Sequence, residues 1–448
     1  MGRKLSLAIW ELLLYLLNTV NDINGSLNTF SKSYERPTTT FSILPIAGLT
    51  LLDILMRKVR VQTNGVGYRT VARVTSLKNL SAQWRPELRF LVRAADAEEI
   101  TRIAQLRSAG LNNLILLTPN LHATSQWQAE TVVETGSILM DEDVVAVADH
   151  MNHAHVLYRN TDQHHTVFLT NRCNSYCLMC SQPPTKHDDS WLVNEAVEVA
   201  NHIASSPHTL GFSGGEPLLL GEHLRLVLDV FAHQHPSTRY DVLSNGRLLA
   251  DPIYAEKTLK GLSERLTWMV PLYGHADFLH DFVVQSPGAF EETLAGLLNL
   301  HRFGQVVQLR IVLIRPVLEN LAALCEFIGR NLPFVREVAL MACEPIGFAL
   351  ANPELTDIDL RDWSAELSHG FRTLKRAKVP AILMNAPLCA LPQDLWPYAH
   401  KSISDWKRKF AEECATCRVK TECAGLFSWH HQGKHSMKIQ KIEGVLNV

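Results

Sequence analysis

The chain has 448 residues, of which 46% are hydrophobic and 20% are charged, so it is long enough for two or three domains with a large core. Its 43 basic and 45 acidic residues give a net charge of −2, which excludes the basic character of a protein that binds nucleic acid or an anionic membrane. Nine cysteines are too few for a disulfide scaffold of this length, and seven of them lie in motif-like groups. Such grouping indicates metal ligation in a reducing compartment, so we expect a cytoplasmic protein.

Residues 1–40 read as an apolar helix followed by a linker. Leu5 to Val20 is apolar but spans only 16 residues, contains Glu11 and lacks a small-residue cleavage site, whereas a membrane-spanning helix needs about 20 apolar residues. We therefore expect a docked or membrane-surface helix and no transmembrane span. Asn18 to Thr40 is rich in Ser, Thr and Asn, which is typical of a linker.

Residues 41–160 predict a small α+β domain, because short β-like runs alternate with one helical stretch, Ala97 to Ala109. The β-like runs are Tyr68 to Val74, Leu88 to Val92, Asn113 to Leu117 and Val144 to Ala148. This region contains no metal or nucleotide motif. We expect it to serve in packing or in docking a substrate.

Residues 161–345 alternate strand and helix, which predicts parallel βα units. The predicted strands are Thr166 to Thr170, Thr209 to Ser213, Arg239 to Leu243, Leu266 to Leu272, Val306 to Leu313 and Val335 to Met341. The predicted helices are Val193 to Ser205, Glu222 to His233, Pro252 to Ser263, Ala289 to Phe303 and Asn320 to Arg330. Six such units make three quarters of an eight-unit barrel, whose chemistry is expected where the strands end. After Glu344 the βα rhythm stops, and residues 346–448 predict one helix, Asp359 to Lys378, ahead of a cysteine-rich stretch.

Three cysteines follow the first predicted strand of this α/β region. Cys173, Cys177 and Cys180 form a C-x3-C-x2-C triplet. A loop with three cysteines at this spacing can ligate three irons of a [4Fe-4S] cubane and leave the fourth iron open. The alternative is a zinc loop completed by a fourth ligand.

Polar or glycine-rich turns follow the next three strands. Ser213-Gly214-Gly215-Glu216-Pro217 follows the second strand, and its glycines allow the backbone to approach a ligand closely while Glu216 adds a carboxylate. Ser244-Asn245-Gly246 follows the third strand, where the alternative is a plain Asn-Gly turn.

The turn after the fourth strand carries titratable side chains. Tyr273, His275 and Asp277 are candidate catalytic residues there, since such groups could orient a substrate or move protons. The alternative is a loop that satisfies its own side chains.

Four cysteines mark the C-terminal region, namely Cys389, Cys414, Cys417 and Cys423. They could hold a second iron–sulfur cluster. A structural zinc bound by the same four thiolates is the alternative, and His430 or His431 could replace Cys389.

The triplet and the GGEP sequence together resemble the radical S-adenosylmethionine (SAM) superfamily. The resemblance implies that a [4Fe-4S] cluster on the triplet binds SAM through its free iron and that reduction yields a 5′-deoxyadenosyl radical. It also implies SAM-binding roles for a further set of residues. These are Ser213, Gly214, Gly215, Glu216, Ser244, Asn245 and, in the position beside the adenine that is usually aromatic, Met179.

The C-terminal C-x2-C-x5-C resembles the auxiliary-cluster ligands of SPASM and twitch extensions. A full SPASM motif has a further cysteine where this chain has Phe427, so the resemblance implies the shorter form with one auxiliary [4Fe-4S] cluster.

Several segments, among them LTNRCNSYCLMCSQPP and NAPLCALPQDLWPYAHKSISDWK, resemble the His-Xaa-Ser system radical SAM maturase of the HxsC type. The resemblance covers about residues 60–448. It implies a small His-Xaa-Ser repeat precursor peptide as substrate, a second radical SAM maturase as partner, and a reductant such as flavodoxin or ferredoxin. Two alternatives stay open, namely a radical SAM enzyme acting on a small molecule and a non-turning-over iron–sulfur protein that presents the peptide to another enzyme.

Overall fold

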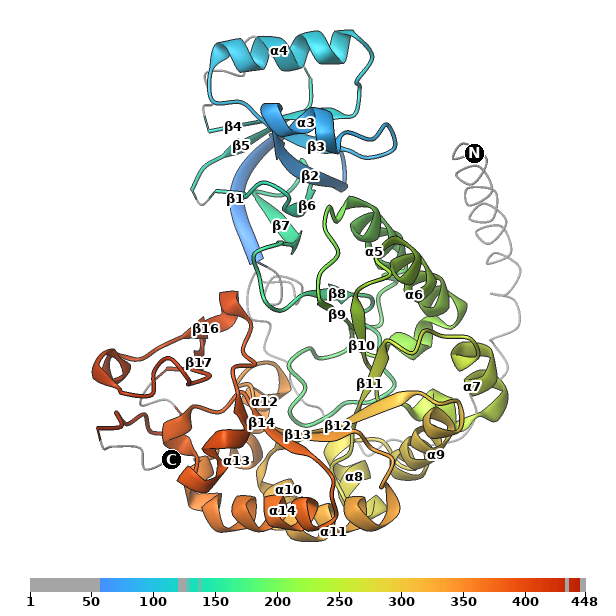
Figure 1. Ribbon diagram of the computed structural model, residues 1–448, viewed down its shortest axis with the longest axis vertical. Coiled ribbons are helices and arrows are strands. Elements are labelled where there is room, and N and C mark those ends of the chain that lie inside the picture. Colours follow the sequence, from blue (N-terminus) through green and yellow to red (C-terminus); the bar gives the residue numbers. More distant parts are fainter. Residues whose placement is uncertain (1–56, 120–126, 128, 137, 432–434, 444–448) are drawn as a thin grey trace. The chain divides into compact units, whose positions relative to one another are not determined.

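The computed structural model describes residues 57–119, 127, 129–136, 138–431 and 435–443. The predicted N-terminal helix and linker lie outside these residues. The described chain contains a closed barrel of seven strands, then a parallel sheet of eight strands, and a short two-stranded sheet near its end (Figure 1).

The seven-stranded barrel has the order β1-β5-β4-β3-β2-β6-β7, and β1 also pairs with β7 to close it. Its elements are β1 (Arg57–Asn64), β2 (Thr70–Ser76), α3 (Leu77–Gln83), β3 (Phe90–Arg93), α4 (Ala97–Ser108), β4 (Leu114–Thr118), β5 (Thr131–Glu134), β6 (Val144–Val147) and β7 (His153–Tyr158). The pairs β2-β3, β3-β4 and β4-β5 are parallel, and the other pairs are antiparallel. Helix α3 provides the crossover from β2 to β3, and α4 provides the one from β3 to β4.

Alternating side chains of the barrel strands form two cores. Leu114 and Leu116 of β4 pack with Ile103 of α4 outside the barrel, while Ile115 and Leu117 belong to the core inside it. The sequence predicted β4 as a short β-like run, since four of its five residues are apolar, and all five are buried. The four predicted strands and the predicted helix are present, and β1, β5 and β7 are additional.

The eight-stranded sheet has the order β15-β14-β13-β12-β11-β10-β9-β8, and all of its pairs are parallel. Its strands are β8 (Thr166–Phe168), β9 (Thr209–Ser213), β10 (Arg239–Leu243), β11 (Leu266–Pro271), β12 (Val306–Leu313), β13 (Glu337–Ala342), β14 (Ala381–Met384) and β15 (Ala399–His400). The α-helices are α5 (Trp191–His202), α6 (Glu222–Gln234), α7 (Pro252–Leu259), α8 (Asp277–Val284), α9 (Ala289–Arg302), α10 (Arg315–Glu319), α11 (Leu321–Asn331), α12 (Phe348–Ala351), α13 (Pro353–Thr356) and α14 (Ser364–Arg376).

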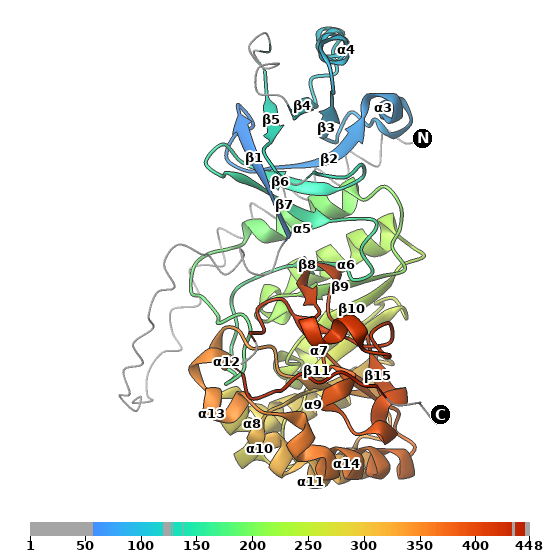
Figure 2. The same ribbon diagram turned by 90° about the vertical axis from the view of Figure 1, so that its left-hand side faces the viewer.

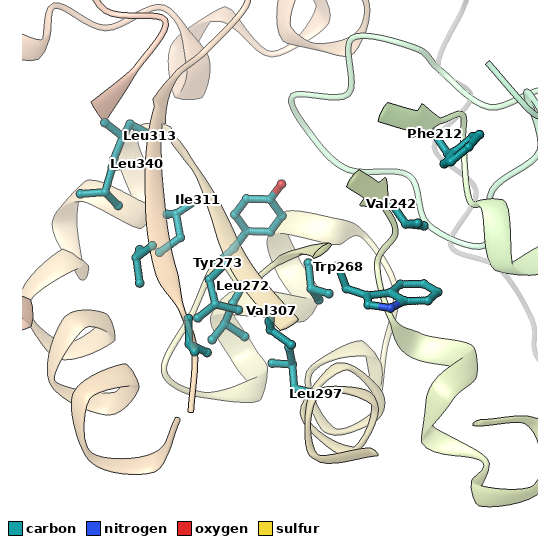
Figure 3. Close-up of a cluster of buried hydrophobic side chains, with 14 of the residues drawn as sticks. Phe212, Val242, Trp268, Leu272, Tyr273, Leu297, Val307, Ile311, Leu313 and Leu340 are labelled. Carbon is teal, nitrogen blue, oxygen red and sulfur yellow. The ribbon is translucent and has the colours of Figure 1, made fainter. Parts of the chain in front are cut away.

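One face of the parallel sheet carries the core, as Figure 3 shows for side chains such as Trp268, Val307 and Leu340. β12 alternates strictly, with its buried residues Val307, Leu309, Ile311 and Leu313 on the helix side. Gln308, Arg310 and Val312 occupy the other face. The face opposite the helices is therefore where a site can form.

The six predicted βα strands are confirmed within two residues at each boundary, and the parallel sheet fits a TIM-like barrel. The expectation that the βα rhythm stops after Glu344 is wrong, because β14 and β15 continue the sheet in parallel. These strands have four and two residues. Strands this short carry too few side chains for a periodic signal.

The cysteine-rich end has little regular structure. It consists of short 3-10 turns, η5 (Leu388–Ala390), η6 (Gln393–Tyr398), η7 (Asp405–Lys407) and η8 (Glu412–Thr416), and the antiparallel pair β16 (Arg408–Lys409) and β17 (Leu426–Phe427). Figure 2 shows this segment as the red part of the ribbon. Over the described ranges, no helix combines the length and the apolar character needed to cross a membrane.

Candidate functional site

The loop that follows β8 carries Cys173, Cys177 and Cys180, which are free thiols. Burial raises the pKa of the Cys173 thiol to about 12 and raises the pKa values of Cys177 and Cys180 as well. Cys180 and Cys173 raise the pKa of Cys177 further, so the three thiols lie close to one another. Metal ligation needs thiolates, and a bound cation would offset the burial of this charge. The donor set fits a metal cluster.

The two glycines after β9 lie directly against this cysteine loop. Gly215 donates its N–H to the Thr170 carbonyl at 2.7 Å, and Glu216 donates to the Arg172 carbonyl at 2.8 Å. A Cβ on Gly214 would stand 2.6 Å from the Thr170 oxygen, and one on Gly215 would stand 2.7 Å from the Arg172 carbonyl carbon. The glycines therefore make room for the backbone of the cysteine loop, in addition to any ligand that they approach.

Glu216 is fully buried, with 0% exposure. Its carboxylate accepts hydrogen bonds from the Ser244 hydroxyl at 2.7 Å, the Asn245 N–H at 2.6 Å and the Leu218 N–H at 2.9 Å. Burial raises the pKa of Glu216, and these donors act in the opposite direction. The structure thus joins the predicted SAM-binding residues after β9 and β10 into one network.

The turn after β10 also reaches the cysteine loop. The Asn245 amide donates to the Asn174 side chain at 2.6 Å, and Arg247 donates to the Asn174 carbonyl at 2.7 Å and to the Ser175 hydroxyl at 3.0 Å. Glu292 of α9 accepts from the Arg247 guanidinium at 2.6 Å. Sequence reasoning missed Arg247, and its place directly after the Ser-Asn-Gly turn was the available signal.

Two more elements fix the far end of the cysteine loop. Leu178 donates its N–H to the Val283 carbonyl of α8 at 2.9 Å, and the Asn352 amide donates to the Leu178 carbonyl at 2.9 Å. The Cys180 carbonyl accepts from the Phe348 N–H at 2.8 Å. Four separate elements of the sheet region therefore hold the loop in one conformation.

A cavity of about 670 Å³ opens on the face of the sheet opposite the helices. Its lining includes inward residues of seven strands, namely Thr166, Phe168, Thr209, Gly211, Ser213, Asp241, Leu243, Met269, Arg310, Val312, Met341 and Met384. Met179, Ser181 and Gln182 of the cysteine loop line it as well, and so do Arg57 and Tyr158 from the seven-stranded barrel. The cavity thus joins the cysteine loop to a space large enough for a ligand.

The predicted catalytic residues lie outside this lining. Tyr273 is 7% exposed, and its burial together with the nearby Cys177 and Cys180 raises its pKa well above the usual value. His275 has a buried Nδ1 without a hydrogen-bond partner, and its ring contacts that of Phe278. Asp277 is exposed in the first turn of α8. The structure therefore places only Tyr273 of the three next to the cysteine loop.

The four C-terminal cysteines come together. Cys389, Cys414, Cys417 and Cys423 line one small cavity of about 20 Å³. Burial raises the pKa values of Cys389 and Cys414, and Cys423 raises both further. The Cys423 sulfur accepts from the Leu388 and Gly425 N–H groups at 3.4 Å each.

Neighbouring residues of the C-terminal group have other surroundings. Phe427 lines the 670 Å³ cavity, while His430 stacks on His435 and does not line the cysteine cavity. Within the described chain, no three His, Cys, Asp or Glu side chains are grouped closely enough to hold a single metal ion.

Residues 167–328 match the Radical SAM superfamily, so the chain carries a domain of that superfamily. No curated protein matches the sequence. Among solved structures, anSMEcpe with bound AdoMet and Cp18Cys peptide is similar at 14% identity and a TM-score of 0.39, over 48% of this chain and 62% of that one. HydG, the FeFe-hydrogenase maturase from Carboxydothermus hydrogenoformans, is similar at 14% identity and a TM-score of 0.38, over 52% of this chain and 55% of that one.

Methylornithine synthase (PylB) is similar at 11% identity and a TM-score of 0.36, over 49% of this chain and 63% of that one. The chain thus spans less than two thirds of the length of each of these three structures.

Proposed function

Because residues 167–328 form a Radical SAM superfamily domain, we propose that this protein is a radical SAM enzyme that modifies a small ribosomally made peptide. The peptide is of the His-Xaa-Ser repeat type, and the enzyme acts in the cytoplasm with a second radical SAM protein and a reductant such as flavodoxin or ferredoxin. The observation that carries the proposal is the cysteine loop, held by four elements at the edge of a 670 Å³ cavity.

In this proposal Cys173, Cys177 and Cys180 hold a [4Fe-4S] cluster. With SAM bound, that cluster supplies a 5′-deoxyadenosyl radical. Gly214 and Gly215 keep the cysteine loop close to the end of β9, and Glu216 fixes the turn that carries Ser244 and Asn245.

The lining of the cavity supports a peptide as substrate. Arg57 and Tyr158 of the seven-stranded barrel line it together with the parallel sheet, so a bound chain would contact both. A small-molecule substrate is the second candidate, because about 670 Å³ lies within the roughly 300–1,000 Å³ range of small-molecule pockets. A non-turning-over iron–sulfur protein that presents the peptide to another enzyme is the third candidate.

Release of 5′-deoxyadenosine tests the enzyme class. Anaerobically reconstituted protein with SAM and dithionite should release it, and the triple Cys173, Cys177 and Cys180→Ala variant should not. Cys325→Ala is the matched control, since Cys325 is buried in α11 among apolar side chains and should leave the reaction intact. Normal SAM cleavage by the triple variant would refute the assignment.

Mass spectrometry of the precursor peptide, co-expressed with and without this protein, tests the substrate. We expect a mass change that requires the three cysteines. An unchanged peptide with active SAM cleavage would favour a small-molecule substrate, and absence of SAM turnover with peptide and partner present would favour the non-turning-over iron–sulfur protein.

A further inference from the structure

Arg310 lies in the middle of the parallel sheet and its side chain lines the cavity. Its three guanidinium nitrogens contact only thioether sulfurs: Met341 at 3.1 and 3.0 Å and Met269 at 3.1 Å. Thioethers are weak acceptors and carry no charge, whereas a guanidinium stays protonated in proteins. Among the described residues, Arg310 therefore has no carboxylate within ion-pair distance.

Other charged groups of the cavity lining are already paired. Arg57 forms an ion pair with Asp162 at 3.1 Å, and Lys407 forms one with Glu344 at 3.2 Å. Arg159 is paired with Asp143, whose carboxylate accepts a hydrogen bond from the Arg159 Nε at 2.8 Å. Arg310 differs from these cations in presenting its charge to the cavity.

Asp241, the remaining acidic residue of the lining, acts on Arg310 through its charge, but the two side chains form no ion pair. Asp241 on β10 is level with Thr267 of β11, whereas Arg310 on β12 is level with Pro271. Four residues of strand separate the two backbone levels, or about 13 Å at 3.3 Å per residue, and the two side chains do not close this offset to ion-pair distance. A buried guanidinium that no carboxylate contacts directly is costly, so it is typical of a group that binds an anionic ligand.

The surroundings of Arg310 indicate what accompanies the anion. Four methionines, Met179, Met269, Met341 and Met384, line the same cavity. Methionine side chains are flexible and polarisable and adapt to ligands of different shape. The lining therefore suits an oxyanion attached to an apolar group.

Resting on the function proposed above, we propose that Arg310 binds a carboxylate of the substrate, namely an Asp or Glu side chain or the C-terminal carboxylate of the peptide. The guanidinium fork matches a carboxylate with two parallel hydrogen bonds. The four methionines contact the apolar atoms of the substrate next to that carboxylate.

Binding of a small probe to the full-length protein as purified tests this assignment without turnover. Isothermal titration calorimetry with N-acetyl-L-glutamate and with N-acetyl-L-glutamine, its uncharged counterpart, should give at least about a tenfold preference for the carboxylate. Arg310→Gln should abolish the preference, and Arg310→Lys should restore part of it. Arg330→Gln is the matched control, because Arg330 lies at an exposed position of α11, paired with Glu326, and should keep the preference.

Equal binding of the two probes to the wild type, including no binding of either, overturns the proposal, as does a preference that survives Arg310→Gln. The carboxylate of SAM itself is the competing source. SAM affinity and SAM cleavage without peptide should be unchanged in Arg310→Gln, and their loss would assign Arg310 to SAM instead. Absence of SAM cleavage by the wild type would count against the proposed function and leave the probe comparison intact.

Discussion

At the residue scale, the glycines after β9 show how a sequence motif can be recognised correctly while its structural reason is missed. The sequence suggested that Gly214 and Gly215 let the backbone approach a ligand. The structure adds that they let the cysteine loop approach the sheet, because a Cβ at either position would overlap Thr170 or Arg172. No pattern in the sequence could predict this, since the contact joins segments about 40 residues apart.

Gly215→Ala should therefore damage the cysteine loop. The added Cβ would stand 2.7 Å from the Arg172 carbonyl carbon and 3.0 Å from the Cβ of Cys173, so the loop backbone must move. Overpacking costs typically about 1–3 kcal/mol, and backbone contacts relieve it poorly. We expect a loss of at least about 2 kcal/mol in the free energy of unfolding, measured by urea denaturation, and a loss of iron uptake by the loop.

Gly136→Ala is the control for this change. Its Cβ would meet only the Cβ of Arg60, at an ordinary 3.9 Å, and should leave stability and iron uptake unchanged. Equal effects of the two substitutions would contradict the role of Gly215 described here.

Glu216 illustrates a second limit at this scale. Its place after two glycines predicted a carboxylate beside a ligand, but its carboxylate accepts hydrogen bonds from the protein itself, at Leu218, Ser244 and Asn245. A sequence indicates that a carboxylate is present at the end of a strand. It does not indicate which neighbouring turn will use its oxygens.

At the element scale, long periodic segments were predictable and short ones were not. β9, β10 and β12 have the bounds expected from the sequence, because each combines a clear run of β-forming residues with a flanking helix. β14 escaped prediction since it has four residues and follows the long segment around α14. α8 escaped because its first turn overlaps the polar stretch that reads as a loop.

Helix α5 connects the parallel sheet to the seven-stranded barrel through buried polar contacts. Glu195 of α5 accepts two hydrogen bonds from Arg69, at 2.5 and 3.0 Å. His202 is the last residue of α5, and its carbonyl accepts a hydrogen bond from the Arg73 Nε at 2.5 Å. The Nε2 of the His202 ring accepts one from the Arg89 backbone N–H at 3.3 Å. These partners are far apart in the sequence, so only the folded chain reveals the junction.

His202 makes this junction sensitive to acid. Burial, followed by the charge of Arg73, lowers the pKa of His202 to about 4 from its ordinary value near 6.5. The unfolded chain therefore binds a proton that the folded chain does not, and stability is fully present above pH 6.5 and falls as the pH drops toward 4. This group alone should remove roughly 2 kcal/mol between pH 7 and pH 5.

Urea denaturation of His202→Gln at both pH values measures this contribution. The difference between pH 7 and pH 5 should shrink by roughly 2 kcal/mol in the variant. His233→Gln, at an exposed position of α6, should show the same difference as the wild type. An unchanged pH dependence in His202→Gln would show that other groups are responsible.

At the scale of the whole molecule, the two cysteine groups are built differently. The first is held by backbone and side-chain hydrogen bonds from the sheet region, whereas the second lies in a segment of short 3-10 turns and two-residue strands. A segment with so little regular structure gains stability from bound metal. The sequence predicted that the four cysteines of this group lie together. Cys414, Cys417 and Cys423 are close in the sequence, and Cys389 is the remaining cysteine of the C-terminal region that can complete a set of four ligands.

In the proposed function, a metal held by the four C-terminal cysteines would decide what reaction the enzyme can complete. Removal of a hydrogen atom from a peptide leaves a carbon radical, and closing it to a crosslink or a double bond requires one further electron to leave. An iron–sulfur site can accept an electron. Zinc, which has no second accessible oxidation state, cannot.

Metal analysis of Cys414→Ala and the wild type separates these cases. We expect about eight Fe per wild-type chain for two cubanes and about four in the variant, with SAM cleavage largely retained because Cys173, Cys177 and Cys180 are untouched. Oxidative modification of the peptide should be lost, and protease cleavage between residues 387 and 442 should increase because metal no longer holds the 3-10 turns together. Cys343→Ala is the matched control, since Cys343 lies after β13 outside both cysteine groups and should keep about eight Fe. About four Fe with one zinc in the wild type would make the C-terminal site structural, and the peptide modification would then be redox-neutral.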